Sequence, residues 1–198
     1  YDLILANVDP NSLEDFQTTI ERIERWSVDG LLMIAPVKSN RYEQLVEQFT
    51  PLPLVQIDIT PGAKVPSVII AQKQGSSAIT RHLLDLGHTR FCEISGPMNW
   101  YAAESRHEGF VSALHSAQLT PIAVVEGKWT PQSGYTCAQK LLADYQFSAL
   151  VVGNDQMALG AMRAIQEHGM RIPEGVSIVG FDDIPEAAHF VPGLTTVR

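Results

Sequence analysis

The sequence is short of basic residues. Its 198 residues include 14 Lys and Arg against 22 Asp and Glu, which gives a formal net charge of −8. No stretch gathers the Lys and Arg clusters that neutralise nucleic-acid phosphates, so this chain alone should bind nucleic acid poorly. No run approaches the ~20 apolar residues of a membrane span, and no signal peptide is present. We therefore expect no membrane contact and a cytoplasmic location.

Cysteine is nearly absent as well. Cys92 lies in an apolar run and Cys137 in a segment of helical period, so we expect two buried free thiols rather than a disulfide. The sequence also lacks a His/Cys cluster of metal spacing, a nucleophile elbow and a Gly-rich phosphate loop. These absences predict no metal, no cofactor and no enzymatic activity, which leaves binding as the function class.

What is present is an alternation of short apolar runs with segments of helical period. The apolar runs are continuous rather than alternating, which is typical of a parallel sheet covered by helices on both faces. The helical segments include 12–26, with Ser12 as N-cap, 75–87 and 157–169. The predicted strands read, in chain order, "DLILAN", "GLLMIAPV", "PLVQIDI", "SVII", "RFCEIS", "IAVVEG", "ALVVGN" and "VSIVGF".

A change of composition at residues 58–67, "DITPGAKVPS", predicts a link between two α/β lobes. The segment carries two prolines and a glycine, which are typical of a connection rather than an element. We assign residues 1–66 to an N-terminal lobe of about three strands and residues 67–198 to a C-terminal lobe of about five.

Polar and aromatic side chains follow several predicted strands at their carboxyl ends. Asp58 ends "PLVQID", Asn154 ends "ALVVGN" and Asp182 ends "VSIVGFD". Trp129 follows "IAVVEGK" at the start of a helix, and Arg106 lies early in the helix after "RFCEIS". Because ligands of open parallel sheets bind beyond the carboxyl ends of the strands, we expect these five residues to line one ligand site.

The chemistry of these five side chains suits a sugar. Carboxylate, amide and guanidinium groups form hydrogen bonds to neighbouring hydroxyls in fixed directions. An indole covers the apolar face of a sugar ring and buries roughly 150–250 Å² of aromatic surface. A carbohydrate is therefore the predicted ligand class.

Each predicted site residue also fits a structural role, and the sequence leaves both roles open. Those roles are a turn stabiliser for Asp58, a turn residue for Asn154, a surface ion pair with Glu104 or Glu108 for Arg106, and a hydrophobic staple for Trp129. The pair Trp100–Tyr101 either lines a pocket or covers the edge of a lobe.

Three further residues are assigned to structural roles. Asp183-x-x-Glu186 fits a capping box, and Asp155 is predicted to cap a helix that begins at Gln156. His88, in "LGHTR", is expected to form structural hydrogen bonds near a turn.

Several motifs resemble those of one protein family. The motifs "NDQMALGAMRAI", "VGFDD", "PGLTTV", "LLDLGHTRF" and "GP…R..GF" occur in the order and spacing of bacterial LacI/GalR-type transcription repressors. "YDLILAN" and "VDGLLMIAPV" are similar to the N-terminal lobe of that family, and "TPIAVVEGKWTPQSGY" resembles its lactose-repressor branch. The resemblance covers essentially the whole chain.

The resemblance implies an α/β fold of the periplasmic-binding-protein-like I type. Two lobes would close on a small effector, usually a sugar or nucleobase, and the change would be passed to a DNA-binding headpiece. Carried over by position, Arg106 matches a ligand-clamping arginine and Asp182 a sugar-hydroxyl acceptor. Asn154 matches the neighbouring amide, Trp129 the aromatic that covers the ring, and Asp58 a first-lobe acid.

The resemblance also implies that parts of the family's architecture are missing from this chain. The helix-turn-helix headpiece, the linker helix, the first strand–helix unit and the elements after "LTTVR" are absent, so we expect an incomplete N-terminal lobe. Ala71–Gln72 replaces a more polar pair, which should make the wall of the first lobe less polar. Family members usually dimerise, which would place residues 187–191 near a partner chain; an ordinary surface helix is the alternative.

Three functions are compared. The first is the effector-binding domain of a repressor, with operator DNA bound only through the absent headpiece. The second is a periplasmic sugar-binding protein of a transporter, which would share the fold. The third, a sugar-modifying enzyme, needs a base and a nucleophile within reach of each other, and the sequence offers no convincing pair. The first function is the prediction.

Overall fold

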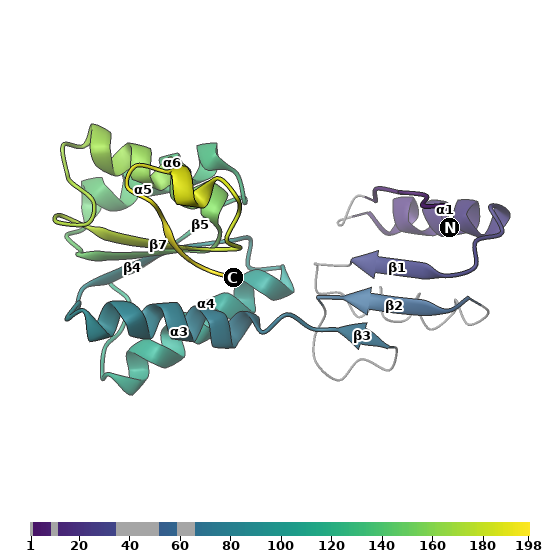
Figure 1. Ribbon diagram of the computed structural model, residues 1–198, viewed down its shortest axis with the longest axis horizontal. Coiled ribbons are helices and arrows are strands. Elements are labelled where there is room, and N and C mark those ends of the chain that lie inside the picture. The colour runs from purple at the N-terminus through teal and green to yellow at the C-terminus, as the bar shows by residue number, and fades with distance from the viewer. Residues whose placement is uncertain (1, 9–11, 35–51, 59–65) are drawn as a thin grey trace. The chain divides into compact units, whose positions relative to one another are not determined.

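The computed structural model describes residues 2–8, 12–34, 52–58 and 66–198 (Figure 1). The chain forms two compact units, Tyr1–Ile70 and Ala71–Arg198. The predicted boundary after residue 66 precedes the strand Ser67–Val68, which pairs within the first unit. Most of the predicted link, residues 59–65, lies outside the described residues.

The first unit is a small parallel sheet with a helix. Its strands, in the order β1-β2-β3, are β1 (Leu31–Ile34), β2 (Leu54–Ile57) and β3 (Ser67–Val68). The helix α1 (Leu13–Arg25) begins as predicted, because Ser12 Oγ accepts a hydrogen bond of 3.1 Å from the Asp15 N–H. The buried core residues of this unit are Phe16, Ile20, Ile23 and Met33.

The predicted first strand, "DLILAN", is wrong. Residues 2–8 form no strand, and Leu3 and Leu5 are exposed by 89% and 83%. An apolar run becomes a strand only when its backbone pairs with a neighbour. Hydrophobicity alone therefore misled the prediction here.

The second unit is a five-stranded parallel sheet covered by helices on both faces, which confirms the predicted fold class (Figure 1). The strand order is β5-β4-β6-β7-β8. After β4 the chain adds β5 at one edge of the sheet, returns to place β6 on the other side of β4, and then adds β7 and β8 toward the opposite edge. The strands are β4 (Phe91–Ser95), β5 (Ala123–Glu126), β6 (Ala149–Val152), β7 (Ser177–Phe181) and β8 (Thr195–Val197). The short strand β8, in "GLTTVR", was not among the predicted strands.

The helices of the second unit form two pairs. One pair is α3 (Gln72–Asp85) with α4 (Tyr101–Ser116), and the other is α5 (Pro131–Asp144) with α6 (Asp155–Glu167). A short 3-10 helix, η1 (Ala187–His189), precedes β8. None of the helices in the described part of the chain combines the length and hydropathy of a membrane span.

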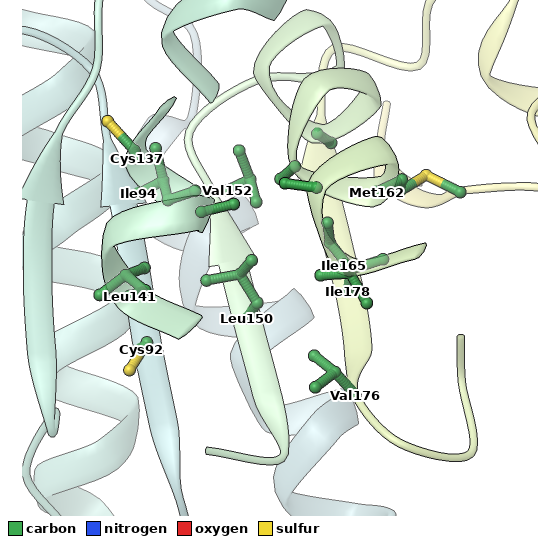
Figure 2. Packing of buried hydrophobic residues seen from close by; sticks show 14 of the residues in the cluster. Cys92, Ile94, Cys137, Leu141, Leu150, Val152, Met162, Ile165, Val176 and Ile178 are labelled. Atoms are coloured by element: carbon green, nitrogen blue, oxygen red, sulfur yellow. The ribbon is translucent and has the colours of Figure 1, made fainter. Parts of the chain in front are cut away.

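The two faces of the sheet build separate cores. On β6, Leu150 and Val152 pack with Leu141 of α5 and Ile165 of α6 on one face (Figure 2). Ala149 and Val151 point the other way and pack in a cluster with Leu83, Phe91 and Phe110. Because alternate residues of β6 are buried on opposite faces, every residue of this strand is buried, as its continuous apolar run predicts.

Both cysteines are buried free thiols, as predicted. Burial raises the pKa of Cys92 to about 11 and also raises the pKa of Cys137. Both thiols therefore stay protonated near neutral pH and behave as small apolar side chains (Figure 2).

His88 has the structural role that the sequence predicts. Its Nδ1 lies 2.9 Å from Ser148 Oγ, and its Nε2 lies 3.0 Å from Ser177 Oγ. The imidazole thus joins the starts of β6 and β7, and burial lowers its pKa. A neutral ring, with one donor and one acceptor nitrogen, fits two hydroxyl partners.

Two glycines allow α5 and α6 to pack closely at their N-terminal ends. A Cβ on Gly134 would collide with the Met157 carbonyl oxygen, and a Cβ on Gly160 would collide with the Pro131 carbonyl oxygen. Close approach here places the residues that precede both helices next to each other, which matters for the site below.

We predict that Gly160→Ala destabilises the chain by about 2 kcal/mol or more, because backbone cannot yield to the new methyl group. The loss should occur even though Ala is favoured over Gly in a helix by about 1 kcal/mol. Urea denaturation measures it. Gly193→Ala is the control, since its Cβ would meet no atom closer than 3.4 Å. Equal stability of the two variants would contradict the close packing.

Candidate functional site

Four of the five predicted site residues lie at the carboxyl edge of the second unit's sheet. Arg106 is on α4, Trp129 precedes α5, Asn154 precedes α6 and Asp182 follows β7. Asp58 lies in the first unit directly after β2, where its N–H donates to Val68 O at 2.9 Å. The four residues of the second unit therefore lie at one edge, as the positions of the strand ends predict. A ligand-binding role for Asp58 stays a prediction.

Arg106 is the centre of this edge. Its Nε donates to Gln72 Oε1 at 2.7 Å, one terminal nitrogen donates to the Gly153 carbonyl, and the other reaches Asp182 Oδ1 at 3.2 Å. The Arg106 side chain is 11% exposed, whereas that of Asp182 is 39% exposed. The cation is thus held by α3 and by the residues that follow β6 and β7. Its carboxylate partner, Asp182, remains partly exposed to solvent.

Aromatic rings flank the guanidinium. Its central carbon lies 3.7 Å from the centre of the Phe181 ring and 5.6 Å from that of Trp129. Cation–π attraction adds to the hydrogen bonds, and the rings limit the directions from which water reaches Arg106. Glu108, one of the alternative partners of Arg106, pairs with Lys73 at 3.1 Å.

The helix that carries Arg106 is fixed to β4 by a half-buried pair. His107 Nδ1 lies 2.6 Å from Glu93 Oε2, and the Glu93 side chain is 3% exposed. The hydrogen bond to Glu93 raises the pKa of His107, and burial raises the pKa of Glu93. This contact is next to Arg106 in the chain and so fixes the rotation of α4 about its axis.

Asn154 has a structural role, although as a helix cap rather than as the turn residue that the sequence left open. Its Oδ1 caps α6 by accepting the Met157 N–H at 2.9 Å, and its Nδ2 donates to Trp129 O at 3.3 Å. Asn154 therefore holds the backbone of Trp129 in place. A direct contact of Asn154 with ligand stays a prediction.

The Trp129 side chain lies over Gly96, where any Cβ would collide with the indole. Residue N4 of α5 is Gly134, which has no side chain, so the hydrophobic staple that the sequence left open as an alternative cannot form. Among the described residues, the Trp129 Nε1–H and the Ser95 hydroxyl are buried side-chain groups without a hydrogen-bond partner. Burying such a group unpaired costs about 1–3 kcal/mol, which a ligand or water atom would offset.

Three of the predicted site residues have a left-handed backbone. The φ angles are +56° at Asp58, +62° at Trp129 and +113° at Asp182. Residues with a Cβ avoid this region, and they concentrate there at binding and catalytic sites. Ser27, Gln118 and Asp183 share this backbone, so the geometry agrees with the strand-end prediction at three positions without selecting them by itself.

Asp155 does not cap the helix, contrary to the prediction. The helix begins one residue earlier with Asn154 as its cap, and the Asp155 side chain is fully buried. Its carboxylate accepts hydrogen bonds from the Thr196 hydroxyl and from the backbone N–H group of Ile184. Burial raises the pKa of Asp155 despite these donors. The carboxylate therefore ties the segment that follows Asp182 to β8.

The predicted capping box at Asp183 is also wrong. Asp183 Oδ2 accepts a hydrogen bond of 2.6 Å from Arg198 Nε. The N-cap of η1 is Glu186, which makes no side-chain capping bond. A pairing partner 15 residues away has replaced the local motif.

Sequence reasoning missed three contributors to the site. Gln72, which was expected to affect the wall of the first lobe, lies instead at the start of α3 and is buried against Arg106. Phe181 and Asp155 were taken as a strand residue and a cap. Their adjacency to Asp182 and Asn154 was the available signal, but local sequence does not give the direction of a side chain. Within the described residues, no group of three or more His, Cys, Asp and Glu could hold a metal ion.

A family model described as "Periplasmic binding protein-like domain" matches residues 80–198. The chain is 36% identical over 201 residues to the HTH-type transcriptional repressor PurR of Haemophilus influenzae strain PittEE, covering 100% of this chain and 60% of that protein. It is 30% identical over 197 residues to the lactose operon repressor of Escherichia coli K12, covering 99% of this chain and 55% of that protein. Sequence identity therefore does not favour the lactose-repressor branch.

Solved structures of transcription regulators also superpose on the chain. The Lac repressor dimer bound to operator and the anti-inducer ONPF superposes with a TM-score of 0.92 at 31% identity, covering 98% of this chain and 68% of that chain. A CelR–cellobiose complex superposes with a TM-score of 0.83 at 28% identity, covering 93% and 58%. The relatives are named as repressors and regulators, in agreement with the expectation of a protein that is not an enzyme.

We predict that Asp155→Ala destabilises the chain by about 2–4 kcal/mol, because it leaves the Ile184 N–H and the Thr196 hydroxyl, both half-buried, without their acceptor. Urea denaturation at pH 7 measures the loss. Asp183→Asn is the matched control on the same turn: Asn tolerates the φ of +50° there, and the pair that it weakens involves a 92% exposed Arg198. A similar loss for both variants would mean that Asp155 does not hold the turn.

Proposed function

Because this chain belongs to the LacI family of transcriptional regulators and corresponds to their effector-binding domain, we propose that it senses a small carbohydrate and thereby controls operator binding. The chain spans about 60% of the length of the PurR relatives that it matches. Operator contact is therefore assigned to a headpiece outside this chain, which agrees with the net charge of −8. A repressor of this kind works in the cytoplasm.

The observation that carries the proposal is the contact between Arg106 and Asp182. A guanidinium and a carboxylate 3.2 Å apart offer donors and acceptors side by side, which is what two neighbouring sugar hydroxyls need. Trp129 next to them supplies an apolar ring surface. The cation is fixed by other contacts, so little ordering is left for the ligand to impose.

In the proposed mechanism, the effector binds at this edge of the second unit and Asp58 of the first unit completes the site. Closure of the two lobes on the effector then shifts the population between two arrangements of the protein. Only an effector that prefers one arrangement shifts the equilibrium, and an effector with equal affinity for both would have no effect.

We also propose that the chain forms a homodimer through the surface around residues 187–191. Val191 is 80% exposed, and its carbonyl accepts a hydrogen bond of 2.7 Å from Gln166 Nε2 on α6. Leu159, two turns before Gln166 on the same helix, is 43% exposed. Exposed apolar side chains on this segment and on the helix that it contacts favour a protein interface over a plain surface helix.

We predict that a thermal-shift screen of mono- and disaccharides and purines will find a sugar that stabilises the chain. At 100 times its dissociation constant, a ligand adds about 2.7 kcal/mol. Arg106→Ala should abolish detectable binding of that sugar in calorimetry while the chain remains folded. Arg163→Ala is the control, because this arginine is 74% exposed and pairs with Glu167 on the surface. Near-native affinity of Arg106→Ala would reject the proposed site.

A second prediction concerns the dimer. Val191→Asp should shift the chain from dimer to monomer in sedimentation velocity, because a charge cannot be buried in an apolar interface without a partner. Leu86→Asp, at another exposed leucine (63%), should leave the dimer unchanged. If the unaltered chain sediments as a monomer at tens of micromolar, this surface is not the interface.

A further inference from the structure

Two tryptophans stand side by side at the edge that carries the proposed site. Trp100 is the N-cap of α4 and Trp129 immediately precedes the N-cap of α5, so they follow the neighbouring strands β4 and β5. Their ring centroids are 5.8 Å apart and the ring planes meet at 60°. Both side chains are only partly buried. Sequence analysis left Trp100 open, and the proposed function uses only Trp129.

The loop that carries Trp100 is tied to the strand before Trp129. The Met98 N–H donates to Glu126 Oε2 at 3.2 Å, and the Trp100 N–H closes a turn onto Pro97 O at 2.9 Å. Trp100 itself makes no side-chain capping bond to α4. The backbone of the loop is thus ordered, and the indole is held beside Trp129 by packing.

The angle between the rings restricts the shape of a ligand that uses both. Two indoles that meet at 60° form two adjoining apolar surfaces rather than one flat surface. A flat bicyclic base stacks on one plane only. Two linked pyranose rings are rotated relative to each other about the glycosidic bond, so each ring can lie against a different indole. A whole aromatic side chain can bury roughly 150–250 Å², and the part of each indole that remains exposed is available to one sugar face.

The polar groups are placed unevenly between the two indoles. The Arg106 guanidinium lies 5.6 Å from the Trp129 ring centre and bonds to Asp182, so the hydroxyls of a ring near Trp129 meet strong partners. A ring against Trp100 would gain mainly apolar contact. One subsite therefore recognises hydroxyl positions, and the other adds affinity through stacking.

We propose that the effector is a disaccharide, with one ring against Trp129 beside Arg106 and Asp182 and the other ring against Trp100. This inference rests on the proposed function and adds the ligand's size and a second subsite. Trp100 is then the residue that distinguishes a disaccharide from its component monosaccharide.

The test is calorimetry on the unaltered chain and on Trp100→Ala, with cellobiose, lactose and maltose, their monosaccharides glucose and galactose, and the purine hypoxanthine. One disaccharide should bind the unaltered chain at least about 10-fold more tightly than either of its monosaccharides. Trp100→Ala should weaken that disaccharide about 10-fold and change the monosaccharide affinity less than about twofold. Trp26→Ala, at a tryptophan of the first unit packed by Arg22, should change neither.

Each outcome decides the proposal. Equal affinity for disaccharide and monosaccharide, or an equal loss for both in Trp100→Ala, overturns the second subsite while the sensor function stands. Binding of hypoxanthine without any sugar overturns the ligand class alone. No binding by any compound contradicts both this inference and the proposed function. If Trp100→Ala does not fold, the affinity ratio on the unaltered chain still decides. Trp100→Phe, which keeps a smaller aromatic ring, should then weaken disaccharide binding by less than the ~10-fold expected for loss of the whole indole.

Discussion

The arrangement of the site depends on how a single buried cation is satisfied. The Arg106 guanidinium reaches the side chain of Gln72, the carbonyl that follows β6 and the carboxylate that follows β7. A charge buried to this extent is tolerated only when its N–H groups have partners, so these three points must keep their distances. The edge of the sheet is therefore constrained as one unit, and no single loop defines the candidate site by itself.

Much of this edge could be predicted from the sequence. The direction of parallel strands decides which residues share an edge, and that rule brought Arg106, Trp129, Asn154 and Asp182 together before any contact was known. The roles of adjacent acids could not be predicted in the same way. Asp155 fits a helix cap as well as Asn154 does, and the choice is made by Thr196 and Ile184, which lie 41 and 29 residues further along the chain. The strand predicted for "DLILAN" was wrong for the same reason, since a strand needs a pairing partner that its own residues do not specify.

The unfavourable backbone angles at three of the predicted site residues persist because neighbouring groups restrain each of them. The Asp182 N–H donates to Val197 O at 2.9 Å, and the Asp58 N–H donates to Val68 O at the same distance. The carbonyl of Trp129 accepts from Asn154. Each left-handed residue thus takes part in a hydrogen bond through its own backbone. A site built in this way is ordered before a ligand arrives, which reduces the entropy lost on binding.

The burial of both thiols has a practical consequence. Cys92 and Cys137 are the only cysteines of the chain, and both are enclosed and protonated near neutral pH. A cysteine introduced at Leu32 in the first unit or at Leu86 in the second, which are 68% and 63% exposed, would be the reactive one. Maleimide dyes would react with cysteines introduced at these two positions and leave the two buried native cysteines unlabelled. Energy transfer between the dyes would then follow the spacing of the two units in solution.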